Sequence, residues 1–149
     1  MARKVLEAGI VPFTLGADMH GYNTKVPKPA GSPDSHPDDE MHLFAGDTRF
    51  SLTRAMTELL ALGLPLEDII PMVSSHCASM LKMAGTIGTL TKGSIADVSV
   101  IADERGRWLL ADNDGTQVTA ERMLTPLFCL RGGRRIDADA PILPNLAAA

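Results

Sequence analysis

The patterning of apolar residues changes along the chain from the period of a helix to that of short strands. From Ser51 onward apolar residues recur at spacings of three and four, as on one face of an amphipathic helix, and Gly63 supplies a stop. A second helix is expected to begin at Pro65 and to be interrupted or kinked at Pro71, because a proline inside a helix costs about 3 kcal/mol or more. Gly85 closes this helical part, so we expect a helical unit followed by a β unit.

The residues after Gly85 form short apolar runs separated by turn signals. The runs are Ile87 to Leu90, Ala96 to Ile101, Trp108 to Ala111 and Leu127 to Leu130. The turn signals are Lys92-Gly93, Glu104-Arg105-Gly106, Asn113-Asp114-Gly115 and Gly132-Gly133. Strand-length runs divided in this way indicate an antiparallel β unit, in which Gly93 and Asp97 are interpreted as turn and strand-entry residues.

The first residues predict a helix end and then a strand. Ala2 to Gly9 has helix-forming residues ended by glycine, and we expect the last turns of a helix that begins before the chain does. Ile10 to Asp18 is an apolar run without clean alternation, which suits a strand buried on both faces of a parallel sheet. Pro12 cannot donate to a ladder, so the strand is expected to start at about Phe13.

Residues 24–47 are dense in proline, glycine and charge and have no period. A loop this long is usually a lid, a binding loop or disordered, and we predict a lid or a mobile excursion. The densest group of possible metal ligands lies in it: His36, Asp38, Asp39, Glu40 and His42. Their spacing matches no known metal loop, so a solvated lid is favoured over an accessory metal site.

Composition excludes several classes of function. The 18 acidic and 14 basic residues give a net charge of −4. This charge does not favour binding to nucleic acid, because such binding depends on lysine and arginine contacts to phosphate. No apolar run reaches the roughly 18 residues of a membrane span, and the charged start does not suit a signal peptide, so a cytoplasmic protein is expected. Cys77 and Cys129 lie far apart without zinc-site spacing and are interpreted as buried thiols.

Several stretches, in the same order, resemble a known family. The stretch from Gly9 to Asn23, where Asp18 is followed closely by a histidine and an asparagine, resembles the segment around the eighth barrel strand of amidohydrolase-superfamily deacetylases. Phe50 to Ile70 matches next. The run Gly88-Thr89-Leu90-Thr91-Lys92-Gly93-Ser94-Ile95-Ala96-Asp97-Val98 resembles the signature with which such proteins return to their small β domain. The matches extend over most of residues 5–136, which makes the resemblance to deacetylases and dihydroorotase-like amidohydrolases fairly specific.

The resemblance implies an α/β fold class and a portion of a larger protein. Residues 1–86 would be the end of a TIM barrel, with its last strand, the lid-like loop and helices. Residues 87–138 would be the C-terminal part of a small antiparallel β-sandwich domain, and residues 139–149 a flexible tail. A complete eight-stranded barrel takes about 250 residues, which a chain of 149 residues cannot hold. Two departures are His76-Cys77-Ala78, where the family commonly has Asn-Pro-Ala, and Pro71 in place of unbroken helix.

The resemblance also implies a site. Asp18 would ligate a divalent metal, with zinc expected, and would take a proton from the metal-bound water that attacks a carbonyl. His20, Tyr22 and Asn23 would line the pocket for a small amide substrate, with a solvent-facing loop as the equal alternative. The other family ligands, including a His-x-His pair, match nothing here, so this chain alone is expected to be inactive.

The reaction implied is hydrolysis of a non-peptide C–N bond, in an N-acyl amino acid or a cyclic amide. The alternative is a non-catalytic fragment or a stand-alone protein-interaction module, and a homo-oligomer is compatible with both. His76 is interpreted as a packed or capping histidine. The arginines of Arg131-Gly132-Gly133-Arg134-Arg135 are interpreted as part of a tight hairpin, with an anion site as the alternative.

Overall fold

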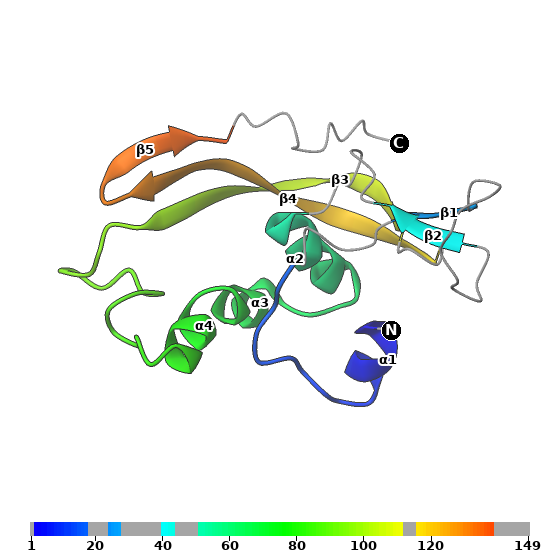
Figure 1. Cartoon of the computed structure of the whole chain (residues 1–149), viewed down its shortest axis with the longest axis horizontal. Coiled ribbons are helices and arrows are strands. Elements are labelled where there is room, and N and C mark those ends of the chain that lie inside the picture. The colour runs from blue at the N-terminus through cyan, green and yellow to red at the C-terminus, as the bar shows by residue number, and fades with distance from the viewer. Residues whose placement is uncertain (1, 18–23, 28–39, 44–50, 112–115, 139–149) are drawn as a thin grey trace.

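The computed structural model describes residues 2–17, 24–27, 40–43, 51–111 and 116–138. Its elements follow the chain in this order: α1 (Ala2–Glu7), β1 (Thr24–Pro27), β2 (Glu40–Leu43), α2 (Leu52–Ala61), α3 (Leu66–Met72), α4 (Ser75–Met80), β3 (Val98–Ala111), β4 (Gln117–Arg131) and β5 (Arg134–Asp137). Figure 1 shows the helices gathered on one side of the long β3–β4 ribbon, with α2 nearest to it.

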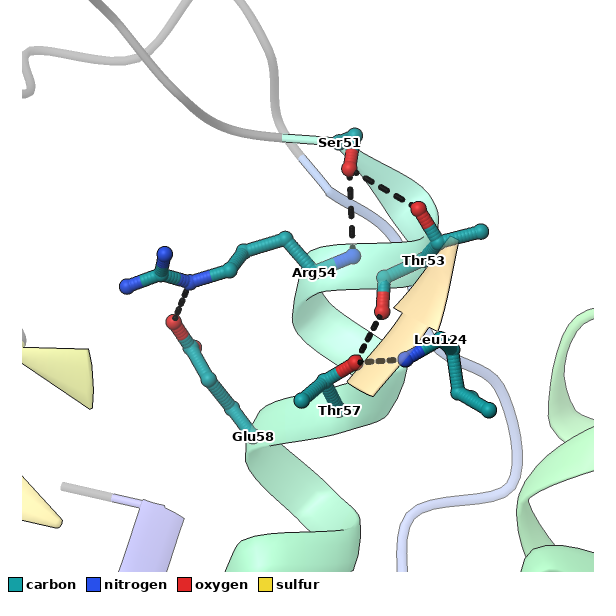
Figure 2. Close-up of polar contacts among 6 residues, drawn as sticks. All are labelled: Ser51, Thr53, Arg54, Thr57, Glu58 and Leu124. Carbon is teal, nitrogen blue, oxygen red and sulfur yellow. Dashed lines mark hydrogen bonds and ion pairs between the residues drawn. The ribbon is translucent and has the colours of Figure 1, made fainter. Parts of the chain in front are cut away.

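Helix α2 forms where the sequence predicts it and has a complete N-terminal cap. The side chain of Ser51 accepts a hydrogen bond from the backbone N–H of Arg54 at 3.1 Å, which satisfies one of the unpaired donors of the first turn. One turn further on, the Arg54 side chain donates to Glu58 at 3.0 Å (Figure 2). Gly63 follows the helix with φ of +99°, a backbone conformation that glycine adopts without steric cost. The predicted stop at Gly63 is therefore confirmed, and Ser51, where the helical pattern starts, is the N-cap.

Helices α3 and α4 are the two halves of a helical stretch broken after Pro71. α3 begins after Pro65, carries Glu67 and Asp68 in its first turn, and ends at Met72. A proline inside a helix clashes with the preceding turn, and the chain leaves helical geometry at Ser74 before α4 begins. The predicted interruption is therefore confirmed.

The β unit is a three-stranded antiparallel sheet in the order β3-β4-β5. Its first ladder runs from Val98 opposite Leu130 to Ala111 opposite Gln117, with register shifts after Val100 and after Arg105. A tight turn at Gly132 and Gly133, both with positive φ, joins β4 to β5. The prediction of an antiparallel unit is confirmed, with the turn at Gly132-Gly133 where it was expected.

Three finer expectations about this unit are wrong. Ile87 to Leu90 is no strand, and Ile87 forms only an isolated bridge with Ala84. Glu104-Arg105-Gly106 is no turn, because β3 continues through it and accommodates the glycine in an irregular register. Residues 117–126 were not predicted as a strand, although they form most of β4.

Two buried clusters hold the helices to the sheet. The first contains Met56, Leu59, Ile69, Met72 and Leu124, from α2, α3 and β4. The second contains Trp108, Leu110, Ala120 and Met123, from β3 and β4, with Ala61 of α2 packed against it. Because Met123 and Leu124 are neighbours on β4, this strand belongs to both clusters. The apolar side chains that the helical period aligns on α2 and α3 thus face the sheet.

The remaining described elements differ from the predictions. The strand expected from about Phe13 is absent in residues 13–17. A parallel strand requires hydrogen bonds to neighbouring strands, whereas the backbone N–H of Leu15 donates to Met72 at the end of α3. The predicted loop 24–47 contains an antiparallel pair, in which β1 and β2 align Thr24 with Leu43 and Pro27 with Glu40. Among the described helices none is long and apolar enough to cross a membrane.

Candidate functional site

The site residues that the sequence suggests follow directly after a segment that the structure describes. Asp18, His20, Tyr22 and Asn23 lie outside the described residues, as do His36, Asp38 and Asp39 of the predicted lid. Residues 10–17, which lead directly to Asp18, are described. The described contacts nearest to Asp18 in the sequence are those that fix this segment.

The helices α3 and α4 hold the segment before Asp18 at two points. The backbone N–H of Leu15 donates to the carbonyl oxygen of Met72 at 3.1 Å. The ring nitrogen Nδ1 of His76 lies 2.8 Å from the carbonyl oxygen of Phe13, and the two rings stack with centroids 4.3 Å apart and planes 5° from parallel. In Figure 1 the segment after α1 runs beside α3 toward α2. The expectation of a packed histidine is confirmed.

The break between α3 and α4 provides one of these two anchors. α3 ends at Met72, and the last carbonyl groups of a helix have no partner within the helix. The Met72 carbonyl oxygen accepts from Leu15 and also from the thiol of Cys77, whose Sγ lies 3.2 Å away. The end of α3, one residue after Pro71, thus presents the acceptor that Leu15 uses.

The described residues offer no metal centre of their own: none of their histidines, cysteines, aspartates and glutamates gather in groups of three or more that could hold an ion. Cys77 and Cys129 are half-buried, which corrects the expectation of buried thiols. Cys77 stays partly exposed because α4 lies at the edge of the core, where its neighbour Met80 is 63% exposed.

Charged side chains of the sheet pair with one another rather than forming a site. Arg122 donates to both carboxylate oxygens of Asp103 across β3 and β4, at 3.0 and 2.6 Å. The hydrogen bonds from Arg122 hold the pKa of the Asp103 carboxyl below its ordinary value. Because the folded-state pKa is depressed, the stabilisation from this pair is present above the unfolded pKa of about 3.9 and is lost as the pH falls through the folded pKa.

The arginine-rich turn is a hairpin, as the sequence predicts. Asp97 accepts from the backbone N–H of Gly132 at 2.6 Å, which joins the entry of β3 to the β4–β5 turn. Arg135 lies over the ring of Phe128, 4.1 Å from its centroid, and pairs with Asp137 at 2.7 Å. With its guanidinium engaged in this way, Arg135 is part of the hairpin rather than of an anion site.

Comparison with known proteins finds similar curated proteins and solved structures, of which two of each are described below, while no family model matches. A deacetylase from Brucella anthropi is 22% identical over 138 residues, covering 93% of this chain and 29% of the relative. A deacetylase from Agrobacterium fabrum is 21% identical over 138 residues, covering 93% of this chain and 28% of the relative.

Two solved structures match over nearly the same share of the chain as the sequence relatives do. An adenine deaminase matches with a TM-score of 0.68 and 19% identity, over 91% of this chain and 31% of the neighbour. A dihydroorotase matches with a TM-score of 0.65 and 19% identity, over 92% of this chain and 30% of the neighbour. The resemblance to deacetylases and to dihydroorotase-like proteins is thereby confirmed. The chain has the fold of a portion of the two neighbours and spans roughly 30% of the length of the relatives and neighbours.

Proposed function

We propose that this chain is the part of a metal-dependent amidohydrolase that contains the segment leading to Asp18, the adjoining helices and part of the small β domain. The complete enzyme would hydrolyse a non-peptide C–N bond in an N-acyl amino acid or a cyclic amide. The observation that supports this most is the match to two deacetylases over 93% of the chain, together with the shared fold.

Asp18 is the residue to which we assign the central role. The segment that delivers it is held by hydrogen bonds to Leu15 and Phe13, so the backbone three residues before the carboxylate is fixed against α3 and α4. In the proposed mechanism Asp18 is one metal ligand, accepts a proton from the attacking water and passes it to the leaving nitrogen. A bound divalent metal such as zinc would supply a water of lowered pKa and a polarised carbonyl.

His20, Tyr22 and Asn23 follow Asp18 closely enough in sequence to contact the same substrate. A phenol, an amide and an imidazole can donate hydrogen bonds to a carboxylate or carbonyl group of an N-acyl amino acid. As the resemblance implies, the further ligands of a catalytic metal would come from other strands of the complete enzyme.

The test uses the complete reading frame that includes this chain. Asp18→Asn removes the proton acceptor while preserving size, and we expect the rate of N-acetyl amino acid or cyclic amide hydrolysis to fall by about 10²- to 10⁴-fold. Bound metal is measured by elemental analysis of the same samples. Asp137→Asn is the matched control, because this carboxylate is 61% exposed on β5 and should leave the rate unchanged. A protein that binds no divalent metal and whose hydrolysis is insensitive to Asp18→Asn would refute the proposal.

A further inference from the structure

We propose that His76 is a positioning residue that sets the path of residues 13–17, the segment that leads directly to Asp18 in the sequence. This inference rests on the proposed function for its catalytic consequence, but the contacts that carry it are independent of that function. His76 belongs to α4 and contacts Phe13, which is 63 residues earlier in the chain.

The His76 ring makes two kinds of contact with one residue. The carbonyl oxygen of Phe13 can only accept, so Nδ1 of His76 must carry the proton, and this contact selects the Nδ1–H tautomer of the neutral ring. The stacked arrangement fixes the plane of the imidazole as well. Phe13 remains 53% exposed, so its position is not set by burial in the core. The imidazole is therefore a directional clamp on the backbone of the segment.

The second anchor, the hydrogen bond from Leu15 to Met72, lies close to the His76 contact and holds the same segment. Met72 and His76 are four residues apart across the α3–α4 break, and they bind Leu15 and Phe13, which are two residues apart in the segment. Both contacts use backbone atoms of the segment, and both partners lie at the α3–α4 break, so the segment is fixed against this break. Within the described part of the chain no strand pairs with residues 13–17, and these two hydrogen bonds replace a ladder.

Only two residues separate Leu15 from Asp18, to which the proposed function assigns the metal and proton-transfer roles. Catalytic groups must be held to within a fraction of an ångström, and a misplacement of about 1 Å can lower a rate by about 10²-fold. Loss of the His76 clamp would leave Leu15 bonded to Met72 at one point, about which the segment can pivot. We therefore expect His76 to affect kcat more than KM.

Three substitutions separate the two contacts. His76→Asn retains a side-chain donor and removes the ring, His76→Phe retains a ring and removes the donor, and His76→Ala removes both. Ser79→Ala is the matched control, because Ser79 lies on the same helix and is exposed. Hydrogen exchange of the Leu15 amide in the complete protein measures how firmly the segment is held, and initial rates on the N-acetyl amino acid or cyclic amide give kcat and KM.

We expect His76→Ala to accelerate exchange at Leu15 by about tenfold, the equivalent of one net hydrogen bond, and to lower kcat by about 10- to 100-fold with little change in KM. His76→Asn and His76→Phe should each recover part of both effects, whereas Ser79→Ala should alter neither. If His76 served only to stabilise the fold, His76→Ala would accelerate exchange as much throughout α2 as at Leu15, and this result would overturn the positioning role.

The outcomes also distinguish this inference from the proposed function. Unchanged exchange at Leu15 in His76→Ala overturns the positioning role, even where Asp18→Asn abolishes hydrolysis. A wild-type kcat in His76→Ala overturns it as well, even where exchange at Leu15 rises. Full activity of Asp18→Asn refutes the proposed function alone, because the exchange measurement does not depend on catalysis.

Discussion

Thr57 joins α2 to β4 through a hydroxyl that is both donor and acceptor. It donates to the carbonyl oxygen of Thr53 at 2.8 Å and accepts from the backbone N–H of Leu124 at 3.0 Å (Figure 2). The side chain is fully buried. Thr57→Val should lower the free energy of unfolding by about 1–3 kcal/mol, because valine has the same shape and leaves the Leu124 N–H without a partner. Chemical denaturation followed by circular dichroism measures the change.

The hydroxyl can be separated from the shape of the side chain with two further variants. Thr57→Ser retains the hydroxyl and should lose less stability than Thr57→Val, about 1 kcal/mol for the missing methyl group. Thr119→Val makes the same change at an exposed position of β4 and should be neutral within about 0.5 kcal/mol. If Thr57→Val unfolds at the wild-type denaturant concentration, the hydrogen bond to Leu124 contributes nothing.

At the scale of elements, Gly106 allows β3 to pass through its second irregularity. A Cβ built on this glycine would lie 2.5 Å from the ring of Trp108, which packs in the second buried cluster. Gly106→Ala must therefore displace the ring or the strand, and we expect a loss of about 1–3 kcal/mol. Trp108 is the single tryptophan of the chain, so its fluorescence reports the displacement directly as a red shift in emission.

Gly16→Ala is the control for this prediction. Its added Cβ would meet no atom within 4 Å, and the backbone of Gly16 does not have positive φ. It should change neither the emission maximum nor the unfolding midpoint. An unshifted emission maximum in Gly106→Ala would mean that the strand gives way instead of the ring.

Helices were more predictable from the sequence than strands because their determinants are local. The caps and stops of α2 and α3, at Ser51, Gly63 and Pro65, act within one turn. Strand pairing depends on residues far apart, so an apolar run could be mistaken for a strand at Ile87 to Leu90. Conversely, Glu104-Arg105-Gly106 has the composition of a turn but is an irregularity inside β3, which only its pairing with β4 reveals.

The candidate site was predictable in part for the same reason. The sequence indicates a packed role for His76, which the structure confirms, but its partner Phe13 lies 63 residues away and no local pattern points to it. The acceptor at Met72 is a backbone atom, which carries no sequence signal at all. Asp18, His20, Tyr22 and Asn23 lie outside the described residues, and their roles remain predictions.

For the whole molecule, the two buried clusters should make the helices and the sheet unfold together. Ile69 of α3 is fully buried in the cluster that contains Leu124, and the neighbour of Leu124 on β4, Met123, belongs to the cluster around Trp108. Ile69→Ala leaves a cavity and should cost about 2–5 kcal/mol, a large share of the roughly 5–15 kcal/mol that stabilises an ordinary domain.

Two probes observed in the same denaturant series test this coupling. Far-ultraviolet circular dichroism follows the helices, and Trp108 fluorescence follows the sheet cluster. We expect Ile69→Ala to shift both midpoints to lower denaturant by the same amount, because the clusters share β4 and form one cooperative unit. Ile70→Ala removes the same atoms from the neighbouring residue, which is 40% exposed, and should shift both midpoints much less. A shift of the helical transition alone, with the tryptophan transition at its wild-type midpoint, would show that the helices and the sheet are independent folding units.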